Sequence, residues 1–277
     1  MIVISTGNDF LSGIKNYLFD LDGCIWFGDQ LAPGAVEVIS ELRGARCNVR
    51  FATNISSHTP EEIAGRLNAL GIDAGGEDIL SPLRVLPYHE AFRERSAKVY
   101  VVAGETVKRF ITNAGISIVD RPETATVVVV GRSPEFDYHD ITASMAATDA
   151  GARLLALNLD MRAPGPDGTF SLPGTGILAA ALAVAGGIQA ELIGKPSPHF
   201  FETGLSLFQF DRVSTAMVGD SIDSDIMGGS KAGLTTVLIG TGLHARENES
   251  DDLVEPDFSM PNLIELHRTI TQLQNIQ

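Results

Sequence analysis

Short apolar runs of strand length alternate with helical patterns along most of this 277-residue chain. The runs lie at residues 16–19, 47–53, 98–103, 126–131, 153–158, 190–194, 214–219 and 234–240. Residues 127–130 are four consecutive valines, so this strand is apolar on both faces, which is typical of a parallel strand covered by helices on each side. The alternation therefore predicts an α/β fold with doubly wound parallel sheets.

The clearest helix is predicted to begin after Thr59, which forms a capping box with Glu62 and is followed by Pro60 at the first helical position. Apolar residues then recur at positions 63, 67 and 70, and Gly71 closes the helix. Further helices are expected at residues 34–42, 105–113, 138–150, 175–185, 198–207, 221–232 and 261–274.

The chain is longer than a typical single domain, so two lobes are expected. The pattern is interrupted by a Ser-Pro pair at residues 81–82 and by Gly-Lys-Pro-Ser-Pro at residues 194–198, which lie about 110 residues apart. We predict a catalytic core built from residues 1–82 and 193–277, with residues 83–192 inserted as a separate α/β domain.

Composition narrows the functional classes. The chain carries 35 acidic against 20 basic residues, and without a basic cluster this charge of −15 does not favour nucleic-acid binding. Cys24 and Cys47 lack metal-ligand spacing, which suits a reduced, cytoplasmic compartment. Because no apolar stretch approaches the length of a membrane helix and no signal peptide is evident, a membrane location is not expected.

Two acids, Asp20 and Asp22, come directly after the first apolar run, and Gly23 lets the chain turn there. Carboxyl ends of parallel strands are where open α/β sheets place their chemistry. Like charges this close imply a cation between them, a raised pKa on one of them, or both. An acidic turn after a strand is also common, so the pair gains meaning only from motifs further along the chain.

Three more motifs follow apolar runs. Residues 53–57 (Thr-Asn-Ile-Ser-Ser) precede a helix and form either an anion cradle or an ordinary polar turn. Lys195, between a glycine and a proline, is either a fixed cation or a solvated lysine. Asp220, Asp223 and Asp225 form either an oxygen-ligand site suited to Mg²⁺ or an acidic helix start, the latter being favoured for Asp223. If the four strands share one sheet, the motifs converge into a site for phosphoryl transfer through a carboxylate nucleophile.

This set of motifs, namely D-L-D-G at 20–23, T-N at 53–54, G-K-P at 194–196 and G-D-x-x-x-S-D-I at 219–226, resembles the haloacid dehalogenase (HAD) superfamily of aspartate-nucleophile phosphatases. The insert is similar to the C2 cap of subfamily IIA, the 4-nitrophenylphosphatase/NagD-like branch. Segments outside the catalytic motifs also resemble that branch, at residues 53–62, 130–138 and 172–176. The resemblance spans nearly the whole chain and implies an HAD-like core with an inserted C2 cap that selects substrates.

The resemblance implies that Asp20 is the nucleophile, forms an aspartyl-phosphate and binds Mg²⁺. Asp22 would protonate the leaving oxygen, then activate water, with its backbone carbonyl on the metal. Asp220 would complete the metal ligands, with Asp225 supporting them from behind. Lys195 would tie the phosphate to Asp20 and offset charge in the transition state.

Phosphoryl oxygens would be held by Thr53 and by the backbone N–H groups of Asn54 and Ile55. Ile55 departs from the second asparagine often seen in this branch, and His58 from a common basic residue; both lie near the expected cradle. Cys24 replaces the usual threonine or valine, and an exposed thiol there would be sensitive to oxidation. Two cap residues, Asn158 and Asp160, either reach over the site or form a polar turn.

The sequence therefore predicts a Mg²⁺-dependent phosphomonoester hydrolase acting on a small soluble metabolite, such as a sugar phosphate, nucleotide or phosphoglycolate. One alternative is a dinucleotide-binding protein, which only Gly174-x-Gly176-x-x-Ala179 supports and for which a clear preceding strand is missing. The other is a non-catalytic protein on the same scaffold, against which the intact motifs argue. The resembled branch also implies a homodimer through the cap.

Overall fold

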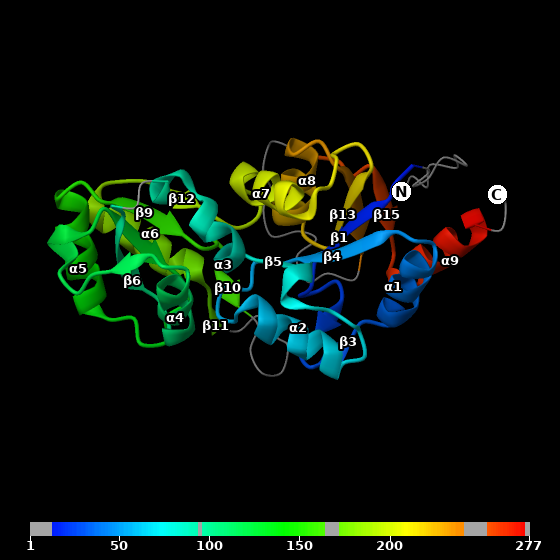
Figure 1. Cartoon of the computed structure of the whole chain (residues 1–277), viewed down its shortest axis with the longest axis horizontal. Helices are drawn as coiled ribbons and strands as arrows, with labels where there is room; N and C mark the ends of the chain where they lie inside the picture. Colours follow the sequence, from blue (N-terminus) through cyan, green and yellow to red (C-terminus); the bar gives the residue numbers. More distant parts are fainter. Residues whose placement is uncertain (1–12, 94–95, 164–171, 241–253, 275–277) are drawn as a thin grey trace. The chain divides into compact units, whose positions relative to one another are not determined.

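The computed structural model describes residues 13–93, 96–163, 172–240 and 254–274, and the chain folds into two compact units (Figure 1). Unit 1 comprises the described residues of Met1–Thr53, Ala64–Leu80 and Phe201–Gln277, and unit 2 comprises those of Asn54–Ile63 and Ser81–Phe200. Each unit is built on a parallel sheet with helices, so the predicted α/β class is confirmed. The domain boundaries derived from the sequence stay a prediction.

Unit 1 contains a six-stranded parallel sheet with β1 near its middle. Its strand order is β15 (Phe258–Met260), β14 (Thr235–Ile239), β13 (Thr215–Gly219), β1 (Asn16–Phe19), β4 (Asn48–Ala52) and β5 (Ile79–Leu80). The chain leaves β1 toward β4 and later returns on the other side of β1 as β13, which makes a topological switch point beside β1. The carboxyl ends of β1, β4 and β13 are therefore neighbours.

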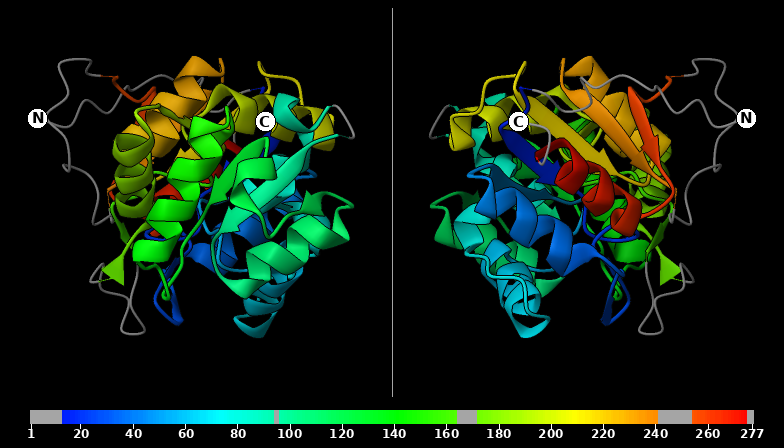
Figure 2. Two further views of the ribbon diagram at one scale, coloured as in Figure 1. Left: turned by 90° about the vertical axis from the view of Figure 1, so that its left-hand side faces the viewer. Right: turned by 90° about the vertical axis from the view of Figure 1, so that its right-hand side faces the viewer.

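Helices cover both faces of this sheet, which explains why every residue of β1 and β13 is buried. Helices α1 (Ala35–Gly44) and α9 (Leu263–Gln274) lie side by side, with α8 (Met227–Lys231) on the opposite face (Figure 2). Unit 1 also contains most of α7 (Pro198–Phe208). Burial along the whole length of both strands, including the polar Asn16 and Thr215, is thus what is expected of parallel strands covered on each face.

The predicted capping box at the start of α2 (Pro60–Ala69) is confirmed. The backbone N–H of Thr59 donates to Glu62 Oε2 (2.8 Å), and the backbone N–H of Glu62 donates to Thr59 Oγ1 (3.2 Å). These reciprocal bonds satisfy two donors that a helix start leaves without intrahelical partners.

The helix predicted at residues 221–232 is wrong as a single element, because it begins as a π-helical turn, Ile222–Ile226, and only then continues as α8. The Ser221 carbonyl accepts from the N–H groups of both Asp225 (3.0 Å) and Ile226 (3.1 Å), and Asp225 Oδ2 accepts from the Ser221 N–H (3.1 Å). The wider turn folds the Asp225 carboxylate back toward the end of β13.

Unit 2 contains a five-stranded parallel sheet. Its order is β12 (Ala190–Leu192), β9 (Arg153–Ala156), β8 (Val127–Val130), β6 (Lys98–Val102) and β7 (Ser117–Ile118). Helices α5 (Tyr138–Asp149) and α6 (Thr175–Gly186) contact each other and one face of the sheet, while α4 (Glu105–Asn113) covers the other (Figure 2). Val128, Val130, Leu154 and Ala156 alternate along β8 and β9 and pack under α5 and α6.

Short elements complete the two units, and the sequence did not predict most of them. They are the hairpin β2 (Trp26–Phe27) and β3 (Gln30–Leu31), the antiparallel pair β10 (Arg162–Ala163) and β11 (Leu172–Pro173), helix α3 (Pro82–Val85), and 3₁₀ turns at Gly76–Asp78, Leu86–Tyr88, Glu90–Phe92 and Pro122–Thr124. Within the described ranges, none of the helices has both the length and the apolar character needed to cross a bilayer.

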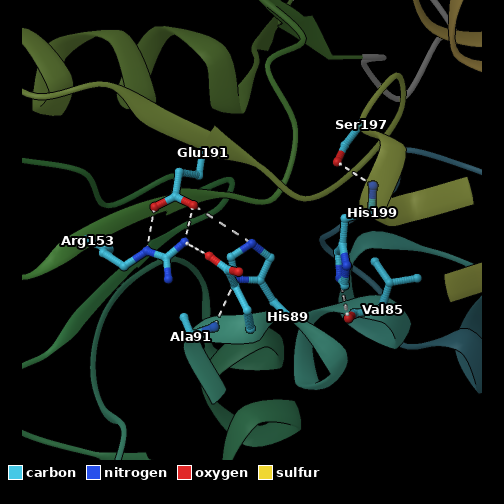
Figure 3. Close-up of polar contacts among 8 residues, drawn as sticks. Val85, His89, Ala91, Arg153, Glu191, Ser197 and His199 are labelled. Carbon is cyan, nitrogen blue, oxygen red and sulfur yellow. Dashed lines mark hydrogen bonds and ion pairs between the residues drawn. The ribbon is translucent and has the colours of Figure 1, made fainter. Parts of the chain in front are cut away.

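A charged cluster ties β9 and β12 to the segment after α3 (Figure 3). Arg153 donates to both carboxylate oxygens of Glu191, with Nε to Oε1 at 2.6 Å, and its Nη2 donates to Glu90 (2.7 Å). The buried His89 ring lies beside them, with its Nε2 3.9 Å from Glu191 and its centroid 5.0 Å from that of His199. Burial, and secondly the neighbouring His199, lower the pKa of His89.

Candidate active site

Three of the four sequence motifs lie at adjacent strand ends of unit 1. Asp20 follows β1, Thr53 follows β4 and Asp220 follows β13. The fourth strand does not join them: β12, which precedes Lys195, pairs with β9 in the five-stranded sheet of unit 2. The condition that all four strands share one sheet is therefore not met, and the sequence could not reveal this because a three-residue strand gives no local sign of which sheet it will extend.

The carboxylates of Asp20, Asp220 and Asp225 form a buried cluster at these strand ends. One oxygen from each lies within 4.8 Å of the other two, and the three residues expose 6%, 1% and 0% of their surface. Three like charges this close and this deeply buried repel strongly unless a cation lies among them. Oxygen-only donors suit a hard divalent cation, so the residues present fit the metal that the sequence predicted.

Glycines allow the carboxylates to come this close. Gly23 has φ +88°, and a Cβ there would lie 2.3 Å from Asp220 Oδ2. A Cβ on Gly219 would lie 2.2 Å from Asp225 Oδ2. The glycines of the D-L-D-G and G-D motifs are thus required by the approach of a neighbouring carboxylate as well as by the turns.

The Asp22 side chain has a different environment. It is half-buried, and its Oδ1 accepts a hydrogen bond from the indole Nε1 of Trp26 at 2.8 Å. The sequence reasoning missed Trp26; the only signal was an aromatic residue four positions after the acid. Asp20 and Asp22 are equivalent acids in the motif, but their side chains have different neighbours: Asp20 lies among carboxylates, and Asp22 accepts from an indole.

The residues that flank these carboxylates are buried as well. Thr53 is buried, and its N–H donates to the Leu80 carbonyl (2.9 Å), which fixes the end of β4. The Cys24 thiol is buried, with its sulfur 3.9 Å from the Val218 carbonyl. Cys24 therefore does not present the exposed thiol considered from the sequence.

In unit 2, the Asn54 amide clamps the backbone of Lys195. Asn54 Oδ1 accepts from the Lys195 N–H (2.8 Å), and Asn54 Nδ2 donates to the Lys195 carbonyl (3.2 Å). Lys195 is buried, and its peptide bond to Pro196 is cis. A Cβ on Gly194 would lie 2.5 Å from Asn54 Oδ1 and 2.7 Å from the Leu157 carbonyl, so the glycine of G-K-P permits the clamp.

Asn158 and Asp160, which follow β9, complete this network. Asn158 Nδ2 donates to the Asn54 carbonyl (2.8 Å) and to Ser56 Oγ (3.4 Å), while Asp160 Oδ1 accepts from Asn54 Nδ2 (3.2 Å). The sequence left these two residues between a site role and a polar turn. The structure places both against Asn54, whereas His58 is exposed and contacts Ser57 (3.1 Å), and Ile55 is half-buried.

The glycines of L-P-G-T-G pack against the same loop. The N–H of Gly174 donates to the Met161 carbonyl and that of Gly176 to the Asp160 carbonyl, each at 3.0 Å. A Cβ on Gly174 would lie 2.0 Å from the Asp160 carbonyl oxygen. These glycines follow the two-residue antiparallel strand β11, so they lack the parallel βαβ context of a dinucleotide-binding fingerprint.

Comparisons with known proteins agree with this geometry. Residues 17–117 match the model of haloacid dehalogenase-like hydrolases, and residues 192–266 match a HAD-hydrolase-like model. The chain is 34% identical to the 5′-nucleotidase YutF of Bacillus subtilis over 251 residues, 91% of this chain and 96% of the relative. It is 30% identical to an acid sugar phosphatase of Staphylococcus haemolyticus over 253 residues, 91% and 95% of the two chains.

Solved structures show the same likeness. The p-nitrophenyl phosphatase of Archaeoglobus fulgidus matches with a TM-score of 0.82 at 30% identity, covering 92% of this chain and 98% of that one. NagD of Escherichia coli K-12 matches with a TM-score of 0.80 at 26% identity, covering 91% and 98%. The chain therefore belongs to the haloacid dehalogenase-like hydrolases, as a phosphatase of the 4-nitrophenylphosphatase/NagD-like subfamily IIA.

Proposed function

We propose that this phosphatase hydrolyses phosphomonoesters of small soluble metabolites with the help of Mg²⁺, through an aspartyl-phosphate at Asp20. The buried cluster of Asp20, Asp220 and Asp225 carries the proposal, because such a cluster fits a divalent cation. When bound, the metal would offset the charge of the carboxylates and of the phosphate. Asp20 and Asp220 would hold it together with the Asp22 backbone carbonyl, and Asp225 would support them from the turn that also contacts Gly219.

The reaction has two steps. The Asp20 carboxylate attacks phosphorus, the bond between phosphorus and the ester oxygen breaks, and the leaving oxygen takes a proton from Asp22. Water then attacks the phosphorus of the aspartyl-phosphate and gives its proton to Asp22, which frees phosphate and restores the Asp20 carboxylate. The different partners of the two carboxylates support this division of roles.

Binding of the phosphoryl group is assigned to Thr53, the N–H groups of Asn54 and Ile55, and Lys195. The Lys195 ammonium offsets negative charge as the phosphoryl group transfers. The clamp between Asn54 and the Lys195 backbone supports this assignment, because it fixes the start of the lysine side chain.

The choice of substrate class is supported by the relatives' names, which include a 5′-nucleotidase and an acid sugar phosphatase. We therefore place nucleoside monophosphates and sugar phosphates first, with phosphoglycolate, glycerol phosphate and pyridoxal phosphate as further candidates. The enzyme is proposed to act in the cytoplasm as a homodimer formed through the cap, without nucleic-acid or membrane partners.

Phosphate release tests the proposal. The wild-type enzyme with Mg²⁺ is assayed on 4-nitrophenyl phosphate and on a panel of these metabolites, beside Asp20→Asn. Asp223→Asn is the matched control, because Asp223 lies on the same turn as Asp225 but outside the carboxylate cluster. We expect Asp20→Asn and EDTA to abolish turnover and the control to retain it. Full activity of Asp20→Asn, or hydrolysis without a metal, would contradict the proposal.

A further inference from the structure

Asp22 and Trp26 are joined by one tight turn that follows β1. The N–H of Trp26 donates to the Leu21 carbonyl (3.0 Å), and the N–H of Gly23 donates back to the Trp26 carbonyl (2.9 Å). The same turn brings the indole Nε1 to 2.8 Å from Asp22 Oδ1. The indole is fully buried, whereas Asp22 is only half-buried, so the ring is the fixed partner of the pair.

Arg66, from α2, holds the outer face of this indole. Its guanidinium carbon lies 4.2 Å from the ring centroid, which is a cation–π contact. Its Nη2 donates to the Gly28 carbonyl and lies 3.4 Å from Asp29 Oδ1, at the tip of the β2–β3 hairpin. Arg66 therefore secures both the ring and the hairpin that carries it.

The chemistry of the indole fits an acid–base carboxylate. An indole N–H donates but never accepts, so it bonds to Asp22 Oδ1 whether or not the carboxyl is protonated on its other oxygen. That bond holds Oδ1 toward the indole and thereby fixes the orientation of the carboxyl group that gives and takes the proton. A carboxyl swinging freely about its terminal torsion would present the proton in the right direction only part of the time.

We infer that Trp26 is a positioning residue for proton transfer by Asp22, and that Arg66 holds Trp26 in place. The inference rests on the proposed function, since it takes Asp22 as the group that protonates the leaving oxygen. It goes beyond that function by assigning a task to two residues outside the four catalytic motifs.

The test compares leaving groups in kcat/KM, which reports on steps up to formation of the aspartyl-phosphate. The alkoxide of glycerol 2-phosphate needs a proton to depart, whereas 4-nitrophenolate departs readily without one. Trp26→Phe keeps an aromatic ring in the buried slot and removes the N–H donor. We expect kcat/KM to fall about tenfold for glycerol 2-phosphate and less than about twofold for 4-nitrophenyl phosphate. Arg66→Met, which keeps an apolar stem over the ring, is expected to give the same pattern with a smaller loss.

Two further variants separate the possible failures. Asp22→Asn should show the leaving-group dependence most strongly. If it lowers kcat/KM equally for the two substrates, the proposed role of Asp22 fails. A second outcome is that Asp22→Asn shows the dependence, whereas Trp26→Phe and Arg66→Met lower kcat/KM equally for the two substrates or leave it unchanged. In that case the role of Trp26 is overturned and the proposed function stands. Arg50→Met is the matched control, because Arg50 lies over the Phe208 ring (5.6 Å) in the same unit, and its loss should not change the ratio between substrates.

Discussion

The strand ends of the two sheets carry polar sites that are built in opposite ways. In unit 1, the carboxyl groups of Asp20, Asp220 and Asp225 crowd one another. In unit 2, the Asn54 and Asn158 amides bind mainly backbone atoms, and the Nδ2 group of each donates to a backbone carbonyl. The first arrangement stores repulsion that a cation relieves, whereas the second is stable by itself and holds a lysine in place.

This difference predicts that the carboxylate cluster of unit 1 is sensitive to a bound metal, whereas the clamp of unit 2 is sensitive to small changes in geometry. Repulsion among buried carboxylates depends on charge, so one amide substitution relieves it. A clamp of hydrogen bonds depends on geometry, so a single added methyl group disturbs it. The following experiments test this contrast, beginning with the largest expected effect.

Asp220→Asn should lower kcat/KM by about a thousandfold, because it removes one of the carboxylates proposed to hold the metal. In EDTA the same variant should unfold at a higher temperature than wild type, since fewer buried charges repel. Added Mg²⁺ should raise the unfolding temperature of wild type more than that of the variant. Thermal unfolding with and without the metal measures this, and an equal rise in both proteins would show that the cluster does not bind the ion.

Gly194→Ala should lower kcat/KM by about ten- to a hundredfold, because its Cβ would meet Asn54 Oδ1 at 2.5 Å and force the clamp open. Gly44→Ala in α1 is the control, because its Cβ would meet no atom within 4 Å. There the better helix propensity of alanine should raise stability by about 0.5–1 kcal/mol, without an effect on activity. Phosphate release measures the activity of the two variants, and urea unfolding measures their stability. If Gly194→Ala were as active as Gly44→Ala, displacement of the Lys195 backbone would not matter for catalysis.

Asn54→Ala should lower kcat about tenfold and the free energy of unfolding by about 1–3 kcal/mol. Asn68 offers a matched control, because its amide makes the same pair of bonds to the Ala74 backbone, at 2.8 and 3.0 Å, in unit 1. Asn68→Ala should lower stability and leave turnover unchanged. If both variants lose activity alike, the loss reflects general destabilisation rather than release of Lys195.

His89→Gln should change only the pH dependence of stability. Since burial lowers the pKa of His89 below its ordinary 6.5, the unfolded chain takes up this proton first as the pH falls. The free energy of unfolding of wild type therefore declines below pH 6.5 by an amount that the variant lacks. Urea unfolding between pH 8 and pH 5 measures the difference, with the exposed His139→Gln as control. Parallel curves for wild type and His89→Gln would contradict the prediction.

Local sequence predicted most of the elements that position the site. Helix α4 has the predicted bounds, Glu105–Asn113, and the capping box before α2 is present, because both depend on residues only a few positions apart. The carboxylate motifs were also recognisable from the sequence. Each directly follows an apolar run, and residues that follow a parallel strand lie at the carboxyl edge of its sheet. Strand β5, the hairpin of β2 and β3, and the antiparallel pair of β10 and β11 were missed, because two-residue strands have no periodicity to detect.

By itself, the sequence determined the α/β class, the elements that alternate along the chain, and the polar residues at their ends, all of which follow from local spacing. Only the tertiary structure decided that β12 joins the second sheet, that Asn54 holds the backbone of Lys195, and that Arg66 lies over Trp26. Each of these contacts joins residues 36 or more positions apart. Such partners are selected by packing across the whole fold, and no short pattern contains that information.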